Sequence, residues 1–343
     1  MLLERATLPA RDAIERLAGL QAQEPRPPFI GLWTRLAGFE REELHAALAR
    51  RKVVRAPLMR ATLHLLSARD YPLWRASLEP VLAGSMRPIT KGLDLDAVLP
   101  AARQLLDEEP RTFTELRRLL AARFPDANER GLGAAVRMHV PLVMVPTDDG
   151  WGFGRDSRFA PADGWLRRSR SRKPAPAELV RRYLAAFGPA SAADFQAWSG
   201  LKGARETFDA LRPKLETFTD ERGRELLDLP DAPRPDEDAP APARFLPDFD
   251  NLVLAHDDRT RVIADDHRGR VTTKNLRIRA TFLVDGVVAG AWSVTRKGKR
   301  ATLRLEPFGR LRKKDLSELT EEGERLLRFV EEDAASFEVK LER

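Results

Sequence analysis

The stretch VVRAPLMRATLHLL, residues 53–66, decides the fold that we expect for the first part of the chain. Residues 53–58 and 61–66 resemble β-strands around a tight turn, and together they predict a hairpin. Helices are predicted before this hairpin, at residues 10–20, 29–36 and 40–49. Two or three helices followed by a hairpin form the arrangement of a winged-helix unit.

The same order of elements recurs twice further along the chain. The second copy has predicted helices at residues 95–106, 113–124 and 128–140, then a hairpin of residues 142–146 and 151–153. The third has predicted helices at residues 176–187, 191–198 and 204–211, then strands at residues 215–219 and 225–229. Because the repeat lies in element order and not in residue identity, it predicts about three tandem winged-helix units.

The C-terminal part of the chain has a different pattern. The proline-rich, acidic stretch PDAPRPDEDAPAP, residues 230–242, excludes a helix or a central strand and predicts a linker or a long loop. Strands are predicted after it, at residues 252–255, 262–263, 280–284, 287–294, 301–305 and 337–341, with a helix at residues 315–332. We therefore expect an α+β protein that ends in a small β-barrel domain.

The expected domains follow from these patterns. They are three winged-helix units at residues 1–85, 86–165 and 166–230, a linker at residues 231–243, and the barrel domain at residues 244–343.

Composition narrows the function classes. The 59 Lys and Arg residues exceed the 52 Asp and Glu residues, giving a net charge of +7 that favours acidic partners such as nucleic acid. The absence of cysteine excludes disulfides, thiol nucleophiles, iron–sulfur clusters and zinc ribbons. No secretory signal and no long apolar run is present, so we expect a cytoplasmic, nucleoid-associated protein without membrane contact.

The basic residues gather in two places. One cluster lies between the second and third predicted units and consists of Arg167, Arg168, Arg170, Arg172 and Lys173. The other lies at the tip of a predicted hairpin and consists of Arg296, Lys297, Lys299 and Arg300. Phosphate contacts by such residues would supply affinity for DNA, and the hairpin tip would suit the minor groove. A solvated surface without a ligand is the alternative for each cluster.

The run LQAQEPRPP, residues 20–28, carries the candidate chemistry. Gln21 and Gln23 are placed at the end of the first predicted helix, directly before a proline break. Amide groups can hold a water and stabilise developing charge, but they cannot act as strong bases. The pair therefore suits a reaction whose leaving group is already activated. A surface or capping role for the two glutamines is the alternative.

Several stretches resemble the AlkZ/YcaQ family of winged-helix DNA glycosylases. They are LAGLQAQEPRPPFIGLWTRLAGF (17–39), MRATLHLLSARDY (59–71), FGPASAADFQAWSGL (187–201), RFLPDFDNLVLAHDDRTRVI (244–263) and FLVDGVVAGAWSV (282–294). The matches occur in the family's order and cover nearly the whole chain. The Gln-x-Gln form is similar to the AlkZ branch, and Ala22 takes the hydrophobic middle position.

The resemblance implies a monofunctional glycosylase that excises N7-alkylated purines, including bulky adducts and interstrand crosslinks. Gln21 and Gln23 match the family's catalytic pair and would hold the attacking water. His64, with Thr62 and Arg60 on the same face of a predicted strand, is a possible site-lining residue. The implied partner is double-stranded DNA carrying alkylated purines. No cofactor, metal or obligate protein partner is expected, and the protein is expected to be a monomer.

Two alternatives remain open at this point. Asp248, Asp250, His256, Asp257, Asp258 and His267 could form a metal site, although their spacing matches no familiar motif and turn-capping or pairing with arginine is more usual. A transcriptional regulator that binds undamaged DNA is the alternative function, because winged helices commonly serve that role. The lesion, and the choice between general repair and self-resistance to a genotoxin, cannot be read from the sequence.

Overall fold

A computed structural model describes residues 1–167, 173–273, 275 and 277–342. Helices and strands are mixed throughout, so the expected α+β class is confirmed. The contacts divide the chain into two compact units. Unit 1 comprises Met1–Leu8, Arg26–Phe39 and Pro233–Arg343, and unit 2 comprises Pro9–Pro25 and Glu40–Ala232. Among the described residues, no helix is long and apolar enough to cross a membrane.

The main sheet of unit 2 has five strands in the order β1-β3-β2-β4-β5. The predicted hairpin at residues 53–66 is confirmed as β2 (Val53–Pro57) and β3 (Leu63–Ser67), which pair antiparallel. Its turn is wider than expected, because the short 3-10 helix η1 (Met59–Ala61) lies at the tip and the Leu58 amide donates to the Thr62 carbonyl. The other strands are β1 (Leu20–Gln21), β4 (Leu142–Met144) and β5 (Phe159–Pro161).

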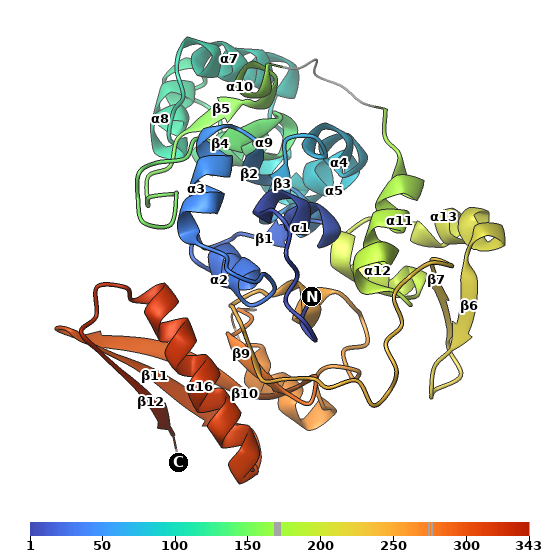
Figure 1. The fold of residues 1–343 in the computed structure, drawn as a ribbon. Coiled ribbons are helices and arrows are strands. Elements are labelled where there is room, and N and C mark those ends of the chain that lie inside the picture. The colour runs from blue at the N-terminus through green and yellow to red at the C-terminus, as the bar shows by residue number, and fades with distance from the viewer. Residues whose placement is uncertain (168–172, 274, 276, 343) are drawn as a thin grey trace. The chain divides into compact units, whose positions relative to one another are not determined.

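The helices predicted for the first two copies form close to the expected positions. In the first stretch these are α1 (Ala10–Arg16) and α3 (Arg41–Ala49), and α4 (Tyr71–Ser77), α5 (Glu79–Ser85) and α6 (Arg87–Thr90) follow the hairpin. In the second they are α7 (Leu95–Glu108), α8 (Phe113–Arg123) and α9 (Glu129–His139), and the short helix α10 (Ala162–Leu166) follows β5. Helix α8 begins at a capping box, in which Thr112 accepts from the Glu115 amide and the Glu115 carboxylate accepts from the Thr112 amide. Helices α7, α8 and α10 gather around β4 and β5 (Figure 1).

The strand predicted at residues 151–153 is wrong. The partner of β4 is β5, with Val143 opposite Ala160, and the segment between them carries Trp151 and Phe153 in an irregular loop. That loop is held by side chains instead of a strand ladder, because the Arg41 guanidinium lies 4.1 Å from the Trp151 ring and the His45 ring contacts the Gly150 carbonyl at 3.3 Å.

The third copy also forms as predicted. It has helices α11 (Pro176–Phe187), α12 (Ala192–Ser199) and α13 (Ala204–Leu211), a 3-10 helix η2 (Arg212–Lys214), and a hairpin of β6 (Glu216–Thr219) and β7 (Glu225–Asp228). No helix or strand lies between Asp228 and Arg244, in agreement with the predicted loop. Because the hairpins of the first two copies share one sheet, the number of winged-helix units stays a prediction.

Unit 1 joins the two ends of the described chain with helix α2 (Pro27–Trp33). The Trp33 ring stacks on Phe329 with ring centroids 5.8 Å apart, and the Arg35 guanidinium donates twice to the Asp250 carboxylate at 2.8 Å. Residues far apart in sequence therefore build one core. Its further elements are β8 (Arg244–Leu246), α14 (Asn251–Leu254), η3 (Asp265–His267), α15 (Arg268–Val271), β9 (Thr281–Val284), β10 (Val287–Lys297), β11 (Arg300–Pro307), α16 (Lys313–Val330) and β12 (Ser336–Leu341).

The predicted C-terminal barrel is wrong, because the sheet of unit 1 is open. Its order is β12-β11-β10-β9-β8, and no pairing between the described residues of β8 and β12 closes it. Strands β11 and β12 are parallel, and α16 makes the connection and packs against β8, β11 and β12 (Figure 1). Since the apolar side of α16 covers a face of the sheet, the sheet buries its core without closing on itself.

Residues 252–255 also differ from the prediction. They were expected to form a strand, but Asn251–Leu254 form helix α14. The cause is local, because the Asp250 carboxylate accepts from the Leu252 amide at 2.9 Å and caps a helical turn. Asp285-Gly286 and Gly298 lie in the turns across which β9 pairs with β10 and β10 pairs with β11.

Candidate active site

The candidate site begins where α1 ends and the chain turns into β1. Ala18 and Gly19 both have positive φ angles, 53° and 92°, and they reverse the chain after the helix. The φ angle of Gly19 strains any other residue, and a Cβ atom there would also lie 2.5 Å from a methyl carbon of Leu66 in β3. The expected helix end at the glutamines is therefore wrong, since α1 ends at Arg16 and Gln21 lies in a strand.

Gln21 and Gln23 both reach the β2–β3 hairpin through their amide oxygens. Gln21 Oε1 accepts from Arg60 Nη2 at 2.5 Å, and Gln23 Oε1 accepts from the Leu63 amide at 3.3 Å. Gln21 is buried at 7% exposure, whereas Gln23 is exposed. The predicted pair is thus held beside one hairpin tip, and Ala22 is buried between its members.

Arg55 binds the backbone of the Gln-x-Gln motif through two hydrogen bonds. It lies in β2 at 3% exposure, and it donates from Nε to the Ala22 carbonyl at 2.8 Å and from Nη2 to the Gln23 carbonyl at 3.0 Å. Burial lowers the pKa of Arg55 to about 10, and the nearby Glu24 carboxylate opposes this shift. The sequence reasoning missed this residue, although an arginine inside the apolar strand VVRAP was a usable signal.

His64 lies directly opposite Gln21 in the strand register, so the two side chains share a face of the sheet. It was expected as a possible site-lining residue, and it is buried at 1% exposure. Burial, with a further contribution from the Arg60 cation, lowers the pKa of His64 to about 3, against the opposing effect of the Thr62 carbonyl. The neutral ring donates from Nδ1 to that carbonyl at 3.0 Å. His64 is therefore a weak base next to the glutamine pair.

Arg60 and Thr62 had been expected in a strand, but they belong to the turn that precedes β3. Arg60 has φ 52° and donates to Gln21 and to the carbonyl of Trp198. The Thr62 hydroxyl donates to the Met59 carbonyl at 3.1 Å and closes the turn. Both residues thus shape the hairpin tip that touches the glutamines. Their role in lining the site stays a prediction.

The two predicted DNA-binding clusters differ in how much the structure describes. Arg168, Arg170 and Arg172 lie outside the described residues, while Arg167 and Lys173 are exposed. In the other cluster Lys297, Lys299 and Arg300 are exposed at the β10–β11 tip. Arg296 is exposed as well, and it pairs with Glu331 at 3.3 Å and donates to the Asp333 carbonyl at 3.1 Å.

Three of the Asp residues that follow β8 have partners within the fold. Asp250 pairs with Arg35, Asp248 with Arg277 at 3.2 Å, and the Asp258 carboxylate accepts from Thr260. The arginines that pair with Asp248 and Asp250 are distant from them in sequence. Over the described ranges, no group of three or more His, Asp or Glu side chains is arranged to hold a metal ion.

Comparisons with known proteins agree over most of the chain. The family model described as "DNA glycosylase AlkZ-like" matches residues 14–329. An interstrand DNA cross-link repair glycosylase from Streptomyces sahachiroi is 26% identical over 322 residues, which cover 85% of this chain and 84% of that protein. The solved structure of the Streptomyces sahachiroi DNA glycosylase AlkZ is similar with a TM-score of 0.83, at 22% identity over 99% of this chain and 95% of that chain.

Proposed function

The chain belongs to the AlkZ-like family of DNA glycosylases, and from this premise we propose that it hydrolyses the N-glycosidic bond of N7-alkylated purines in double-stranded DNA. The observation that supports this proposal most directly is the convergence of the Gln21 and Gln23 amides on one hairpin tip. The glycosylase that it resembles at 26% identity is named for interstrand cross-link repair, which supports crosslinked and bulky lesions as substrates.

The chemistry of the lesion explains why amides suffice. Alkylation at N7 makes the purine cationic, so the bond between C1′ and N9 breaks with the electron pair moving to the base, which leaves neutral. A water adds to the oxocarbenium-like C1′ and loses its proton to solvent, giving an abasic site. The enzyme needs neither a strong general acid nor a cofactor for this step. An amine nucleophile is also unnecessary, so the DNA strand stays intact.

The two glutamines would hold that water and face the developing cation. Each amide oxygen can accept two hydrogen bonds, and the described contacts use one on each, from Arg60 and from the Leu63 amide. The second acceptor position of each oxygen is assigned to the water or the sugar. The Arg60 cation would oppose positive charge at C1′, so its role is to fix the Gln21 amide, with the sugar on the side away from Arg60.

The remaining features fit a protein that works along duplex DNA. We assign phosphate contacts to the exposed Arg167, Lys173, Lys297, Lys299 and Arg300, and winged-helix roles to residues 1–85, 86–165 and 166–230. The β10–β11 tip would probe a groove, so a crosslinked base need not flip into a closed pocket. A monomer acting on nucleoid DNA in the cytoplasm is sufficient for this reaction.

The test uses duplex DNA with one labelled N7-methylguanine and measures abasic sites by alkaline cleavage under single-turnover conditions. We expect the double variant Gln21→Ala plus Gln23→Ala to be about 10²–10³-fold slower, the usual loss for a positioning or charge-stabilising group. Gln196→Ala, which removes an exposed amide from α12, is the matched control and should excise at the unchanged rate. Strand breaks should appear only after alkali.

The outcomes of the excision test distinguish the role of the glutamines, the choice of lesion and the proposed activity itself. Excision that survives the double substitution, with DNA binding intact, would remove the glutamines from the mechanism. If N7-methylguanine is not released, bulky N7 adducts and N7-linked crosslinks are tested in the same format. Tight binding of undamaged DNA without release of any of these bases would refute the proposed activity.

A further inference from the structure

A basic pocket of about 530 Å³ lies in unit 2, at the base of the β2–β3 hairpin. The glutamine pair contacts the opposite end of that hairpin, near η1. The pocket is lined by six cationic and one anionic side chain among its residues, which are Arg11, Glu15, Ala49, Arg50, Arg51, Lys52, Ala68, Arg69, Trp165, Leu166 and Arg167. Only Arg167 among these cations was singled out from the sequence, although the run Arg50-Arg51-Lys52 was a readable signal.

Two backbone turns create the pocket. Helix α3 ends at Ala49, and Arg51 has φ 55°, so the chain turns sharply into β2 and presents Arg50 and Lys52 outward. The Ala68 amide donates to the Lys52 carbonyl at 2.9 Å and fixes this base of the hairpin. On the other side α10 ends at Leu166, and the next residue, Arg167, has φ 50°.

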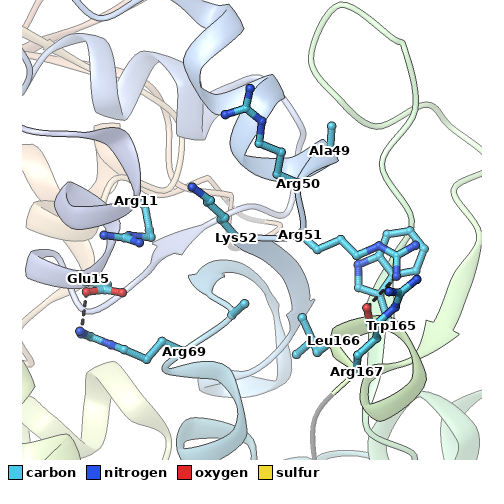
Figure 2. Close-up of a pocket in the computed structure, with 11 residues that line it drawn as sticks. Arg11, Glu15, Ala49, Arg50, Arg51, Lys52, Arg69, Trp165, Leu166 and Arg167 are labelled. Carbon is cyan, nitrogen blue, oxygen red and sulfur yellow. Dashed lines mark hydrogen bonds and ion pairs between the residues drawn. The ribbon is translucent and has the colours of Figure 1, made fainter.

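One wall of the pocket is rigid. The Arg51 guanidinium lies 3.9 Å from the centroid of the Trp165 ring and donates to the Trp165 carbonyl at 2.9 Å. Figure 2 shows Arg51 and Arg167 beside Trp165 on one side, with Arg11 and the Glu15–Arg69 pair on the other and Lys52 extending between them. The wall is therefore organised by a cation–π contact before any ligand arrives.

The cations outnumber their partners. Arg69 pairs with Glu15 at 2.6 Å and Arg11 with Asp12 at 2.7 Å. Across the described part of the chain, no carboxylate pairs with Arg50, Lys52 or Arg167. Like charges gathered in a concave surface repel one another and attract an anion. In DNA, the anionic groups that arginine and lysine contact are the backbone phosphates.

We propose that this pocket binds a phosphate of the DNA backbone, away from the excised base. The proposal rests on the proposed function for the identity of the ligand as DNA. Gln21 is paired with His64, and Ala68 lies four residues further along the same chain, a span of about 13 Å at about 3.3 Å per residue. With an axial rise of about 3.4 Å per nucleotide, the bound phosphate lies about three to five nucleotides from the lesion.

The test removes two of the three exposed cations that have no described carboxylate partner, in the variant Arg50→Gln plus Lys52→Gln. Its affinity for an undamaged duplex is measured by fluorescence anisotropy at several salt concentrations. We expect binding about tenfold weaker or more at 0.1 M salt, and a slope of log K against log salt that is smaller by about one to two. The matched control, Lys91→Gln plus Arg118→Gln, also removes one exposed Lys and one exposed Arg from unit 2 and should change neither quantity.

Single-turnover excision separates failure of the pocket proposal from failure of the proposed function. Single-turnover excision of N7-methylguanine at saturating DNA should keep its wild-type rate in the pocket variant, since the pocket does not touch the reacting atoms. If the wild type excises nothing but the pocket variant still loses duplex affinity, the proposed function fails and the pocket proposal stands. If affinity and salt slope match those of the control variant, the pocket proposal is overturned.

A scan with single neutral methylphosphonates locates the contact. The wild type should lose affinity at one position about three to five nucleotides from the lesion, and the pocket variant should be insensitive there. Titration with inorganic phosphate alone tests whether the pocket binds free phosphate instead of a phosphate of DNA. Tight binding of free phosphate by the wild type, with duplex affinity unchanged in the variant, would make the pocket a small-anion site and overturn the assignment to DNA.

Discussion

The buried neutral histidine next to Gln21 predicts that the fold is sensitive to acid. His64 has a pKa of about 3 in the folded chain because burial disfavours the charged ring, whereas an unfolded histidine has a pKa of about 6.5. Between these values the unfolded chain binds a proton that the folded chain does not. Protonation therefore favours unfolding, and stability falls as the pH drops below about 6.5.

The size of the effect follows from the two pKa values. At pH 4 the unfolded histidine is almost fully protonated while His64 is still neutral, a difference of about 2.5 pH units. At about 1.4 kcal/mol per unit, the free energy of unfolding falls by about 3 kcal/mol relative to pH 7. The loss reaches its full value of about 5 kcal/mol only below pH 3.

The assay is urea unfolding at pH 7 and pH 4 for the wild type and for His64→Gln, which keeps a hydrogen-bond donor but cannot titrate. Other groups titrate alike in both proteins, so the difference between the two pH-dependent losses isolates His64. We expect the wild type to lose about 3 kcal/mol more than the variant. Equal losses of unfolding free energy between pH 7 and pH 4 in the two proteins would refute the inference that His64 is buried in its neutral form.

Three other predictions concern residues that hold the site or unit 1. Gly19→Ala should lower stability by about 1–3 kcal/mol in thermal unfolding, because alanine is strained at φ 92° and its Cβ collides with β3; an unchanged melting temperature would contradict this. Asp250→Asn should lower the free energy of unfolding in urea by about 3–5 kcal/mol, since it leaves the buried Arg35 charge without a counter-charge. The double variant Arg35→Met plus Asp250→Leu should lower it less, because it removes both charges. Arg60→Lys should slow excision about tenfold with unchanged affinity for undamaged duplex, because lysine cannot bridge Gln21 and the Trp198 carbonyl; full activity would mean that Arg60 does not position the amide.

Local patterns predicted the elements of unit 2 well, because each is defined by its own periodicity and end signals. The capping box at Thr112 and the apolar strands around residues 53–66 depend only on neighbouring residues. Strand pairing was harder to predict. The apolar Trp151–Phe153 segment resembled the partner of β4, but Phe159–Pro161 takes that place, and only tertiary contacts distinguish the two.

The candidate site was predicted in its residues but not in its geometry. The Gln-x-Gln motif and its family resemblance pointed to Gln21 and Gln23, whose catalytic roles remain to be tested. The strand that carries Gln21 depends on the left-handed turn at Ala18 and Gly19, which helical periodicity over residues 10–20 concealed. The arginine inside the apolar strand VVRAP was a usable signal, but the partners of Arg55 could not be read from it, since its hydrogen bonds cross from β2 to the motif backbone.

The discontinuous make-up of unit 1 has a consequence for synthesis of the protein. Arg35 and its partner Asp250 are 215 residues apart, so at about 5–20 residues per second the ribosome delivers the second about 10–40 s after the first. During that interval the apolar helix α2 has no core to join, while residues 40–232 can already fold. Truncation before Asp250 would leave α2 permanently exposed, and such a product would be a substrate for chaperones and proteases instead of a smaller working enzyme.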